Sequence, residues 1–424
     1  MPDRVDAWYT PRSTMPTNRE YIEQAQKTYV PNYRQAGFVL ARGKGVRVWD
    51  VEGTEFLDFS GGIAVLSVGH AHPVLAKAIG DQAATLIHTS NLFYSDRAIE
   101  LSVEITKRTG FDRVYFANSG TEANEALIKL GRRWHYERGD KDRTELVATH
   151  NSFHGRTMGA VTLTGQPKYH AGFGPMLPGV SHIPSGDLDA MRKAVGKRTA
   201  AVFLEPIQAE GGLILGTDEY LRGVRAICDE AGALLMFDQV QTGYGRTGRF
   251  LRREHSGVMP DACSLATGIA GGFPLGAIAV TEKLANGLPV GAHGSTFGGN
   301  PLACAAGLAV LRIIDEENLI ANAETMGRYL GEQLASLVAD PSLPAAVEHR
   351  GRGLLQGVRI GPEHDPLGTL AKLREHKVLA SIAGGDVLRF APPLNVTQAE
   401  IDEAVAGLRT ALAQAPAAAA PAKK

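Results

Sequence analysis

The sequence predicts an α/β protein built around a mostly parallel β-sheet. From about residue 73 onward, short apolar runs alternate with longer helical stretches, which is the pattern of βαβ units. One run, 233–237, is apolar throughout and ends on Asp238, as expected for a fully buried parallel strand. A chain of 424 residues is long enough for two domains, or for one large domain with appendages.

The individual elements follow from periodicity and from helix and turn signals. The predicted helices are 18–28, with Asn18 as a candidate N-cap, then 73–86, 96–108 and 302–317. A strand–turn–strand meander covers 46–59. The predicted strands of the main sheet are 113–117, 145–149, 200–204, 234–237 and 264–266. Two later strands, 353–359 and 386–390, indicate a smaller α+β part.

The expected domain organisation follows from these elements. Residues 1–72 form an N-terminal arm, a helix and the meander, and belong to the small domain. Residues 73–300 form the large domain, and 301–412 the C-terminal part of the small domain. The Ala/Pro/Lys-rich tail, 413–424, is expected to be disordered.

Composition excludes several classes of function. The net charge of −1 gives no electrostatic reason to expect nucleic acid or an anionic membrane as a partner. No apolar run reaches the ~18 residues needed to span a bilayer, and the amino terminus lacks the pattern of a secretion signal. The cysteines, Cys228, Cys263 and Cys304, are far apart, which indicates a reducing, cytoplasmic location. His70 and His72 are interpreted as a loop pair rather than as metal ligands.

Asp238 ends the buried strand, at the edge where open α/β sheets bind their ligands. A carboxylate buried there without a partner would lose its charge or destabilise the fold. A protonated heterocyclic nitrogen of a ligand is one partner that would keep it ionised. The alternative is a structural acid that caps the next turn or pairs with Arg246.

A candidate phosphate site follows the predicted strand 113–117. Ser119, Gly120 and Thr121 are small residues at the start of a helix, where free backbone N–H groups and the helix dipole favour an anion. The alternative is an ordinary capping box between Ser119 and Glu122.

Two other strand ends carry side chains suited to a planar, acidic ligand. Phe153 is expected to stack on a flat ring, and Arg156, shortly after it, to hold a carboxylate bidentately. Glu210 is expected to shield an arginine until substrate arrives. The alternatives are a packed phenylalanine, a surface arginine and a solvated loop acid.

Residues 243–248 spell GxGxxG after a strand, which is the pattern of a dinucleotide-binding loop. Such a loop is followed directly by a helix and, ~20 residues later, by an acid. Here Arg-Phe-Leu-Arg-Arg follows over 249–253, and Asp261 comes too early. An NAD-dependent dehydrogenase therefore remains only an outside alternative.

Taken together, these motifs resemble the class III aminotransferases of the pyridoxal 5′-phosphate (PLP) fold-type I superfamily, and within them the acetylornithine, ornithine and succinyldiaminopimelate aminotransferases. The resemblance covers roughly residues 30–412. The segments that carry it are 57–65, 69–73, 88–91, 118–124, 153–157, 238–248, 271–276 and 295–301. It implies a large domain with a mostly parallel seven-stranded sheet, a smaller α+β domain, and a homodimer with shared active sites.

The resemblance also implies which residues contact the cofactor. Asp238 would pair with the pyridinium nitrogen, Phe153 and Val240 would pack on opposite faces of the ring, and Gln241 would reach the phenolic oxygen. The full set of implied cofactor contacts is Ser119, Gly120, Thr121, Phe153, His154, Asp238, Val240, Gln241 and Thr296, the last from the neighbouring subunit.

The implied substrates are a small amino acid and a 2-oxo acid. Arg156 and Arg389 would bind their carboxylates, and Glu210 would gate Arg389 to admit either an amine or 2-oxoglutarate. The sequence does not fix the amino donor, because acetylornithine, ornithine, succinyldiaminopimelate and 4-aminobutyrate share most of this pocket.

One departure from the family pattern concerns the chemistry itself. Where the family has Leu-Ala-Lys-Gly, this chain has 265–268 as Leu-Ala-Thr-Gly, so that Thr267 stands at the position of the Schiff-base lysine. A hydroxyl cannot hold the cofactor covalently and is too weakly basic to shuttle the substrate proton. General acid–base loss alone costs ~10²–10⁴ in rate. Lys283, predicted on a surface helix, does not replace the missing lysine.

Two lesser departures accompany Thr267. Gln239 stands where the family has glutamate, and removes a charge expected to pair with Arg246; Ala209 stands where the family has glycine. Three functions therefore remain open. The first is a transaminase scaffold that binds PLP non-covalently with strongly impaired turnover. The second is a non-catalytic binding or regulatory relative, paired with an active subunit. The third is an enzyme of changed chemistry in the retained pocket.

Overall fold

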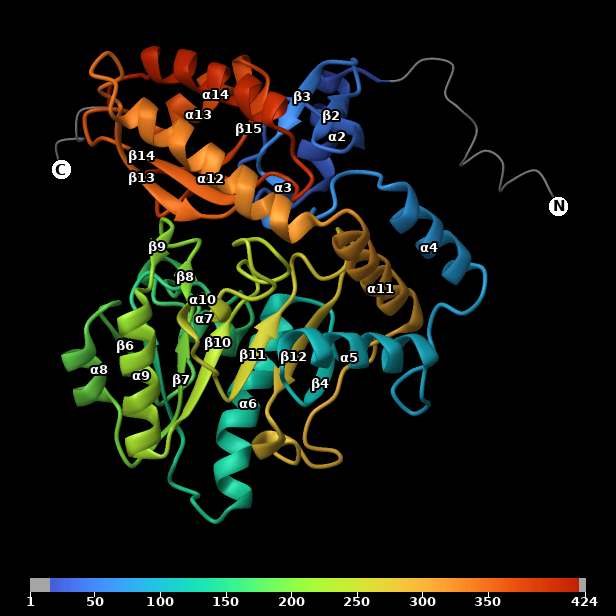
Figure 1. The fold of residues 1–424 in the computed structure, drawn as a ribbon, viewed down its shortest axis with the longest axis vertical. Coiled ribbons are helices and arrows are strands. Elements are labelled where there is room, and N and C mark those ends of the chain that lie inside the picture. The colour runs from blue at the N-terminus through green and yellow to red at the C-terminus, as the bar shows by residue number, and fades with distance from the viewer. Residues whose placement is uncertain (1–15, 419–424) are drawn as a thin grey trace.

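The computed structural model describes residues 16–418, and a seven-stranded sheet forms the centre of its larger part (Figure 1). The strand order is β4-β12-β11-β10-β7-β5-β6. Only β12 runs antiparallel to its neighbours, so the sheet is mostly parallel, as the sequence predicts. The strands are β4 (Arg113–Ala117), β5 (Glu145–Thr149), β6 (Val180–Ile183), β7 (Thr199–Leu204), β10 (Leu234–Asp238), β11 (Ala262–Leu265) and β12 (Gly276–Val280).

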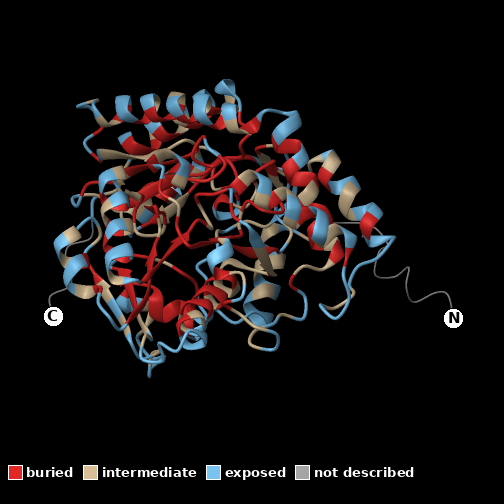
Figure 2. Cartoon of the chain, turned by 60° about the horizontal axis from the view of Figure 1, so that its bottom comes forward, coloured by how far each residue is buried: buried red, intermediate tan, exposed pale blue. Residues whose placement is uncertain are grey.

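The central strands are apolar throughout because both of their faces are buried. In β10, Leu234 and Met236 pack in a core cluster with α6, whereas Leu235 and Phe237 pack in the cluster to which α5, α9 and α11 contribute. Figure 2 shows the buried strands between helices whose outer surfaces are exposed. This arrangement explains a run without polar alternation.

Two four-stranded sheets form a smaller part above this sheet in Figure 1. The sheet β1-β2-β3-β15 joins the two ends of the chain, since β15 pairs in parallel with β3. The second sheet, β13-β14-β17-β16, packs against α12, and β8 pairs with β9. The strands are β1 (Leu40–Lys44), β2 (Arg47–Asp50), β3 (Glu55–Asp58), β8 (Ile207–Gln208), β9 (Ile214–Leu215), β13 (Ala346–Arg352), β14 (Leu355–Ile360), β15 (Val378–Leu379), β16 (Ser381–Ala383) and β17 (Val387–Phe390).

The helices of both parts agree closely with the sequence predictions where these were made. They are α2 (Asn18–Thr28), α3 (Gly61–Ala64), α4 (Pro73–Ala83), α5 (Asp96–Thr109), α6 (Gly120–Glu137), α7 (Met158–Leu163), α8 (Leu188–Ala194), α9 (Asp218–Ala231), α10 (Arg253–Ser256), α11 (Pro301–Glu316), α12 (Leu319–Val338), α13 (Pro366–Glu375) and α14 (Gln398–Ala413). Between residues 16 and 418, no helix is long and apolar enough to cross a membrane.

Some local predictions were wrong or incomplete. The N-cap of α2 is Thr17 rather than Asn18, because the Thr17 hydroxyl accepts from the Glu20 N–H in a capping box. No pattern in the sequence indicated β1 or β6, which are short edge strands with polar residues. Most of the predicted N-terminal arm and half of the tail, 1–15 and 419–424, lie outside the described residues.

Candidate active site

The carboxyl ends of β4, β5, β7, β10 and β11 meet at one edge of the large sheet, because these strands run in the same direction. The segments that leave this edge are the ones that carry the predicted site residues. The fold therefore brings Thr121, Phe153, Glu210 and Asp238 to the same side of the molecule, as expected for a doubly covered α/β sheet.

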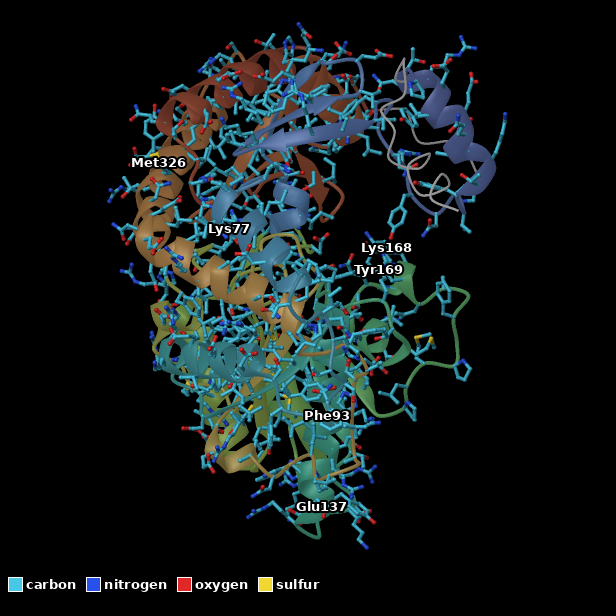
Figure 3. All side chains as sticks on the ribbon, turned by 90° about the vertical axis from the view of Figure 1, so that its right-hand side faces the viewer. Lys77, Phe93, Glu137, Lys168, Tyr169 and Met326 are labelled. Atoms are coloured by element: carbon cyan, nitrogen blue, oxygen red, sulfur yellow. The ribbon has the colours of Figure 1, made fainter. Side chains whose placement is uncertain are left out.

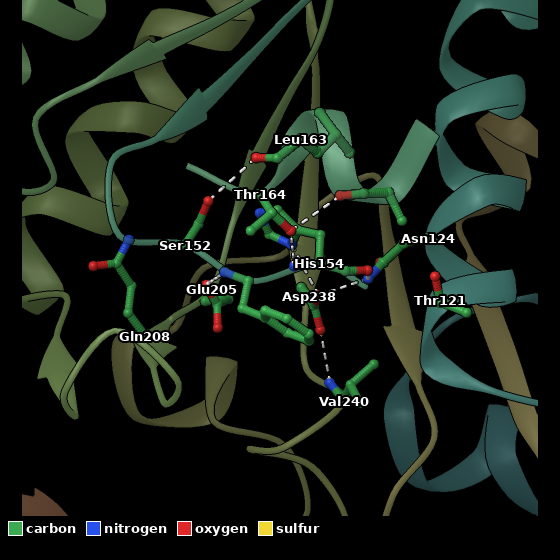
Figure 4. Close-up of polar contacts among 12 residues, drawn as sticks. Thr121, Asn124, Ser152, His154, Leu163, Thr164, Glu205, Gln208, Asp238 and Val240 are labelled. Carbon is green, nitrogen blue, oxygen red and sulfur yellow. Dashed lines mark hydrogen bonds and ion pairs between the residues drawn. The ribbon is translucent and has the colours of Figure 1, made fainter. Parts of the chain in front are cut away.

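Asp238 is buried, with 5% of its surface exposed, and its carboxylate accepts three hydrogen bonds (Figure 4). Oδ2 lies 2.7 Å from Asn124 Nδ2 and 2.9 Å from His154 Nδ1, and Oδ1 lies 3.0 Å from the Val240 N–H. These donors stabilise the ionised carboxylate inside the protein. The turn-capping alternative for Asp238 is thus partly correct, since one of the three donors belongs to the turn that follows β10.

The ion pair between Asp238 and Arg246 is not formed, so that alternative was wrong. The fully enclosed Arg246 side chain instead donates to the backbone carbonyls of Leu354 (3.1 Å) and Pro392, and burial lowers its pKa to about 10. The Gln239 side chain does not reach Arg246 either, since its Oε1 accepts from the Arg253 N–H at 3.1 Å. The positive charge of the Arg246 guanidinium is therefore stabilised by backbone carbonyl groups and not by an acid.

The start of α6 has the geometry of an anion site. Ser119 caps the helix by accepting from the Glu122 N–H (3.3 Å), while the N–H groups of Gly120 and Thr121 have no acceptor among residues 16–418. Glu122 does not close a capping box; its carboxylate accepts from the Asn118 N–H at 2.6 Å. Two free donors at the positive end of a long helix suit a phosphate group.

The Thr121 hydroxyl fastens this helix start to the loop after β5. Its Oγ1 accepts from the backbone N–H groups of Arg156 (3.1 Å) and Thr157 (3.2 Å). Gly155 has a φ of +129°, and a Cβ there would overlap the Thr121 side chain, so only glycine allows this approach. The loop that presents Phe153 and Arg156 is thereby fixed relative to α6.

Arg156 is exposed and makes no ion pair within the described chain; aromatic rings support it instead. Its Cζ lies 3.9 Å from the Tyr169 ring centroid and 5.5 Å from that of Phe153. Lys168 Nζ lies 4.9 Å from the Tyr169 ring, and Figure 3 shows both residues at the surface. Cation–π contact orients a guanidinium without neutralising it, so Arg156 keeps its charge for an anionic ligand. Sequence reasoning missed Tyr169.

Arg389 is the second basic residue of the site and is almost completely buried, at 1% exposure. It lies in β17, and its guanidinium forms an ion pair with Glu210. Gln241 joins this pair, with Oε1 3.1 Å from Arg389 Nη1 and Nε2 3.0 Å from Glu210 Oε1. The structure therefore brings Glu210, Gln241 and Arg389 together from three distant segments.

Glu205 is a polar residue of this edge to which sequence reasoning gave no role. It follows β7, and its Oε2 accepts from the Phe153 N–H at 2.9 Å (Figure 4). Burial raises the pKa of Glu205 well above its usual range, and the negative charge of Asp238 raises it further. The raised pKa favours the protonated form of Glu205 next to the negative charge of Asp238.

Thr267 lies just beyond β11, next to the strand that ends in Asp238. Its hydroxyl donates to the Val240 carbonyl at 2.5 Å. A Cβ on Gly120 would lie 2.9 Å from Val240 and 3.5 Å from the Ala266 Cβ, so residues 120, 240 and 266 adjoin one another. Thr267 is therefore next to the start of α6 and to Val240.

Two further residues of the prediction lie away from the Asp238 carboxylate. Lys283 Nζ pairs with Asp261 at 2.8 Å, at the opposite end of β11 from Thr267. Thr296 is exposed on a loop that borders Asn118 and Glu122, at the outer side of the α6 start. Lys283 is therefore engaged at the far end of β11, and Thr296 lines a pocket together with Asn118 and Glu122.

The arrangement of these groups fits a PLP molecule. Asp238 provides the buried acid for a ring nitrogen, and the α6 start provides two N–H groups for a phosphate. The Phe153 N–H donates to Glu205 beside this edge, and Val240 adjoins Gly120 at the start of α6. The donor set does not fit a dinucleotide: residues 243–252 form turns, and α10, the helix after them, has only 4 residues.

Comparisons with known proteins agree over nearly the whole chain. The aminotransferase class-III family model matches residues 28–412. The acetylornithine aminotransferase of Myxococcus xanthus is 45% identical over 90% of this chain and 94% of that protein. That of Caldanaerobacter subterraneus subsp. tengcongensis is 46% identical over 91% and 97%. The solved ornithine aminotransferase of Toxoplasma gondii, whose active site is partially occupied by PLP, has a TM-score of 0.92 and 33% identity over 98% of each chain.

Proposed function

The chain belongs to the class-III aminotransferases, a PLP-dependent family, and from this premise we propose that it binds PLP without covalent attachment and has strongly impaired amino-group transfer. The observation that carries the proposal is the contrast between two neighbouring strand ends. Asp238 keeps three hydrogen-bond donors, whereas Thr267 offers only a hydroxyl, which already donates to a backbone carbonyl.

In this proposal, the cofactor is held by groups of several segments. When bound, PLP supplies an aldehyde that takes up the amino group and a ring that accepts electrons. Asp238 keeps the ring nitrogen protonated, and Asn124 and His154 hold its carboxylate in place. The N–H groups of Gly120 and Thr121 bind the phosphate, and Ser119 shapes that turn.

Arg156 and Arg389 are proposed to bind the substrate carboxylates. Arg156 is charged, exposed and oriented by Tyr169, so it suits the carboxylate that every substrate carries. Arg389 is paired with Glu210 in the absence of a second carboxylate. A donor without a distal carboxylate leaves this pair closed, and a dicarboxylate such as 2-oxoglutarate displaces Glu210. Gln241 moves with the pair, because it bonds to both members.

Thr267 is proposed to occupy the position of the family's cofactor-binding lysine. Its hydroxyl forms no covalent link to an aldehyde that survives in water, and its basicity is far too low to move the proton of the substrate α-carbon. The hydrogen bond to Val240 also turns the hydroxyl toward the backbone. Both steps that require an amine are therefore lost at this position.

The active form is proposed to be a homodimer with shared sites. Large apolar side chains are exposed on the loops around 92–94 and 297, including Leu92 at 85%, Tyr94 at 96% and Phe297 at 60%. Such a patch indicates a buried interface in the assembled protein. Thr296 adjoins it and would reach the phosphate of the partner. The large domain, 73–300, would carry this interface, and the remaining parts would form the small domain.

The donor is proposed to be an ω-amino acid of the acetylornithine or ornithine type. The relatives named above carry different donors in their names, acetylornithine and ornithine, on the same scaffold. Arg156 and Arg389 bind carboxylates, and acetylornithine and ornithine both carry an α-carboxylate. These two arginines therefore do not distinguish one donor from the other.

The proposal is tested by the state of the bound cofactor. PLP is added to the purified protein, the complex is treated with borohydride without added amine, and the protein is denatured and weighed by mass spectrometry. We expect a saturable absorption change on PLP addition and an unmodified protein mass after reduction. A PLP adduct on any lysine would overturn the non-covalent proposal, and the absence of any saturable change would overturn PLP binding itself.

One observation favours the alternative of a non-catalytic relative over an enzyme of changed chemistry. The Asp238 carboxylate is engaged by three donors of the chain itself, and the Thr267 hydroxyl is engaged by the backbone. The segments 118–124, 153–157 and 238–241 contain no lysine or cysteine that could act as a new nucleophile. The test is to mix the protein with an active class-III subunit and to measure hetero-dimer formation. A stable hetero-dimer would support the non-catalytic relative, and its absence would support the enzyme of changed chemistry.

A further inference from the structure

A group of basic side chains lines a hollow at the end of the segment that leads away from Asp238. The hollow has a volume of about 360 Å³ and lies between α12, the strands β13 and β14, and the residues before α10. Met326, labelled in Figure 3, marks this part of α12. The volume falls within the ~300–1,000 Å³ range of small-molecule sites. Its polar lining consists of Thr247, His255, Glu324, Arg328, His349, Arg352 and Gln356.

Close backbone packing makes the walls of this hollow rigid. Gly353 has a φ of +59°, and a Cβ there would lie 2.6 Å from the Arg246 carbonyl oxygen. Gly327 of α12 packs so closely on Gly353 that a Cβ would overlap its backbone. Because no side chain fits at these contacts, α12, Gly353 and Thr247 are held in fixed positions relative to one another.

The arginines of the hollow have no anionic partner. Among residues 16–418, neither Arg328 nor Arg352 forms an ion pair with a carboxylate, and Arg352 Nη1 donates to His255 Nδ1 at 2.8 Å. His255 Nε2 in turn donates to the Thr247 carbonyl at 3.1 Å, so this imidazole is neutral. The acid at the rim, Glu324, is already paired with Arg249 at 2.7 Å.

Buried polar groups beside the hollow also lack partners. Thr247 is 2% exposed, and its hydroxyl has no hydrogen bond in the described chain. Arg252 is 1% exposed and donates only through Nη2, to Gly216 and Asp218, which leaves Nε and Nη1 without acceptors. Buried donors without acceptors are costly. Of these two residues Thr247 lines the hollow, and a ligand that only accepts hydrogen bonds would satisfy its hydroxyl.

The surrounding charge agrees with this requirement. Burial, followed by the positive charges of Arg352, Arg252 and Arg249, lowers the pKa of His255 to about 4. A field that opposes protonation of a histidine attracts an anion. This positive charge and the lack of carboxylate partners for Arg328 and Arg352 both favour binding of an anion in the hollow.

We propose that this hollow is a binding site for a small oxyanion, a phosphate or carboxylate group, held between Arg328 and Arg352 with Thr247 as an additional donor. Planar guanidinium groups bind such anions bidentately, which a lysine cannot do. The site is separate from the one proposed for PLP, and it goes beyond the proposed function, because it requires neither cofactor binding nor amino-group transfer.

The proposal is tested by titrating inorganic phosphate into the protein at constant ionic strength in an isothermal calorimeter, with PLP present and absent. We expect binding that persists at saturating PLP, and that weakens about tenfold or more in Arg352→Gln, because charge-assisted hydrogen bonds are lost. Titration of acetate in the same way shows whether the site prefers a phosphate or a carboxylate.

A matched control removes one positive charge elsewhere. Arg138 is exposed at the end of α6, where it stacks on Trp134, and Arg138→Gln should bind phosphate as the unaltered protein does. Arg328→Gln serves as a second variant if Arg352→Gln does not fold, as judged by circular dichroism. Failure of both anions to bind at saturating PLP, or equal affinity in all variants, would overturn the proposal. If PLP does not bind, the phosphate affinities of the arginine variants still show whether the hollow binds the anion.

Discussion

Two segments leave the same edge of the large sheet side by side, one after β10 and one after β11, and they differ sharply in chemistry. The β10 strand ends on Asp238, a buried acid whose carboxylate accepts three hydrogen bonds. The β11 end carries Ala266, Thr267 and Gly268, with one hydroxyl that bonds to the backbone. Two adjacent strand ends of one sheet thus present very different side chains, a fully engaged acid on β10 and a single backbone-bonded hydroxyl after β11.

The largest expected effect concerns the β11 end. Thr267→Lys should raise the rate of amino transfer from N-acetylornithine to 2-oxoglutarate by ~10²–10⁴ or more, since it restores both the covalent link and the proton shuttle. The rate is measured by glutamate formation. Mass spectrometry after borohydride reduction should now find PLP on residue 267.

Thr267→Met is the matched control, because it provides similar bulk without an amine. Equal rates in the Thr267→Lys and Thr267→Met variants would contradict the assignment of position 267. A PLP adduct at position 267 of the Thr267→Lys variant without a gain in rate would instead direct attention to Gln239 or Ala209, the other two positions at which the sequence is expected to depart from the family pattern.

The second prediction concerns the β10 end. Asp238→Asn should weaken PLP binding by about 10- to 100-fold, because it removes the anion that pairs with the ring nitrogen and turns an NH₂ group toward Asn124 or His154. Absorption titration measures the dissociation constant. The matched control is Asp261→Asn, a buried acid at the start of β11 that pairs with Arg225 and Lys283. It should lower stability and leave the PLP affinity unchanged.

The contrast between these strand ends also shows what a sequence can predict. The β10 run was identified correctly because both faces are buried and every residue is apolar. The same logic located most of the parallel strands. The edge strands β1 and β6 were missed because one side faces solvent and polar residues interrupt the pattern. The prediction also missed β12, a buried apolar strand inside the sheet, so burial alone did not reveal every strand.

The site could be predicted only in part, for a related physical reason. Asp238, Thr121 and Glu210 follow strand ends, so topology alone brings them together. The partners of buried charges are set by tertiary contact. Arg246 was expected to pair with an acid and is held by two carbonyls, while Asn124 and Tyr169, which support Asp238 and Arg156, carry no signal in local sequence.

The smallest of the three expected effects concerns the ion pair of Glu210 and Arg389, which Gln241 links to the segment after β10. Glu210→Gln keeps the shape and an acceptor for Gln241 but removes the charge that neutralises Arg389, which is 1% exposed. A dicarboxylate then no longer competes with a carboxylate of the protein. Its affinity should rise about tenfold, or ~1.4 kcal/mol, whereas that of a monocarboxylate should not change.

Succinate and propionate are suitable probes for this difference, since they share a carboxylate and differ in the second. Calorimetric titration of both into the PLP-bound protein gives the ratio of their affinities, which should shift in Glu210→Gln alone. Glu348→Gln is the control, because Glu348 pairs with Arg350 at 2.7 Å and with Arg359 at 2.9 Å, and forms no hydrogen bond or ion pair with Glu210, Gln241 or Arg389 among residues 16–418. An unchanged ratio in Glu210→Gln would mean that Arg389 is not the acceptor of the second carboxylate. The gating role would then have no basis, although the ion pair would still stabilise the β17 end.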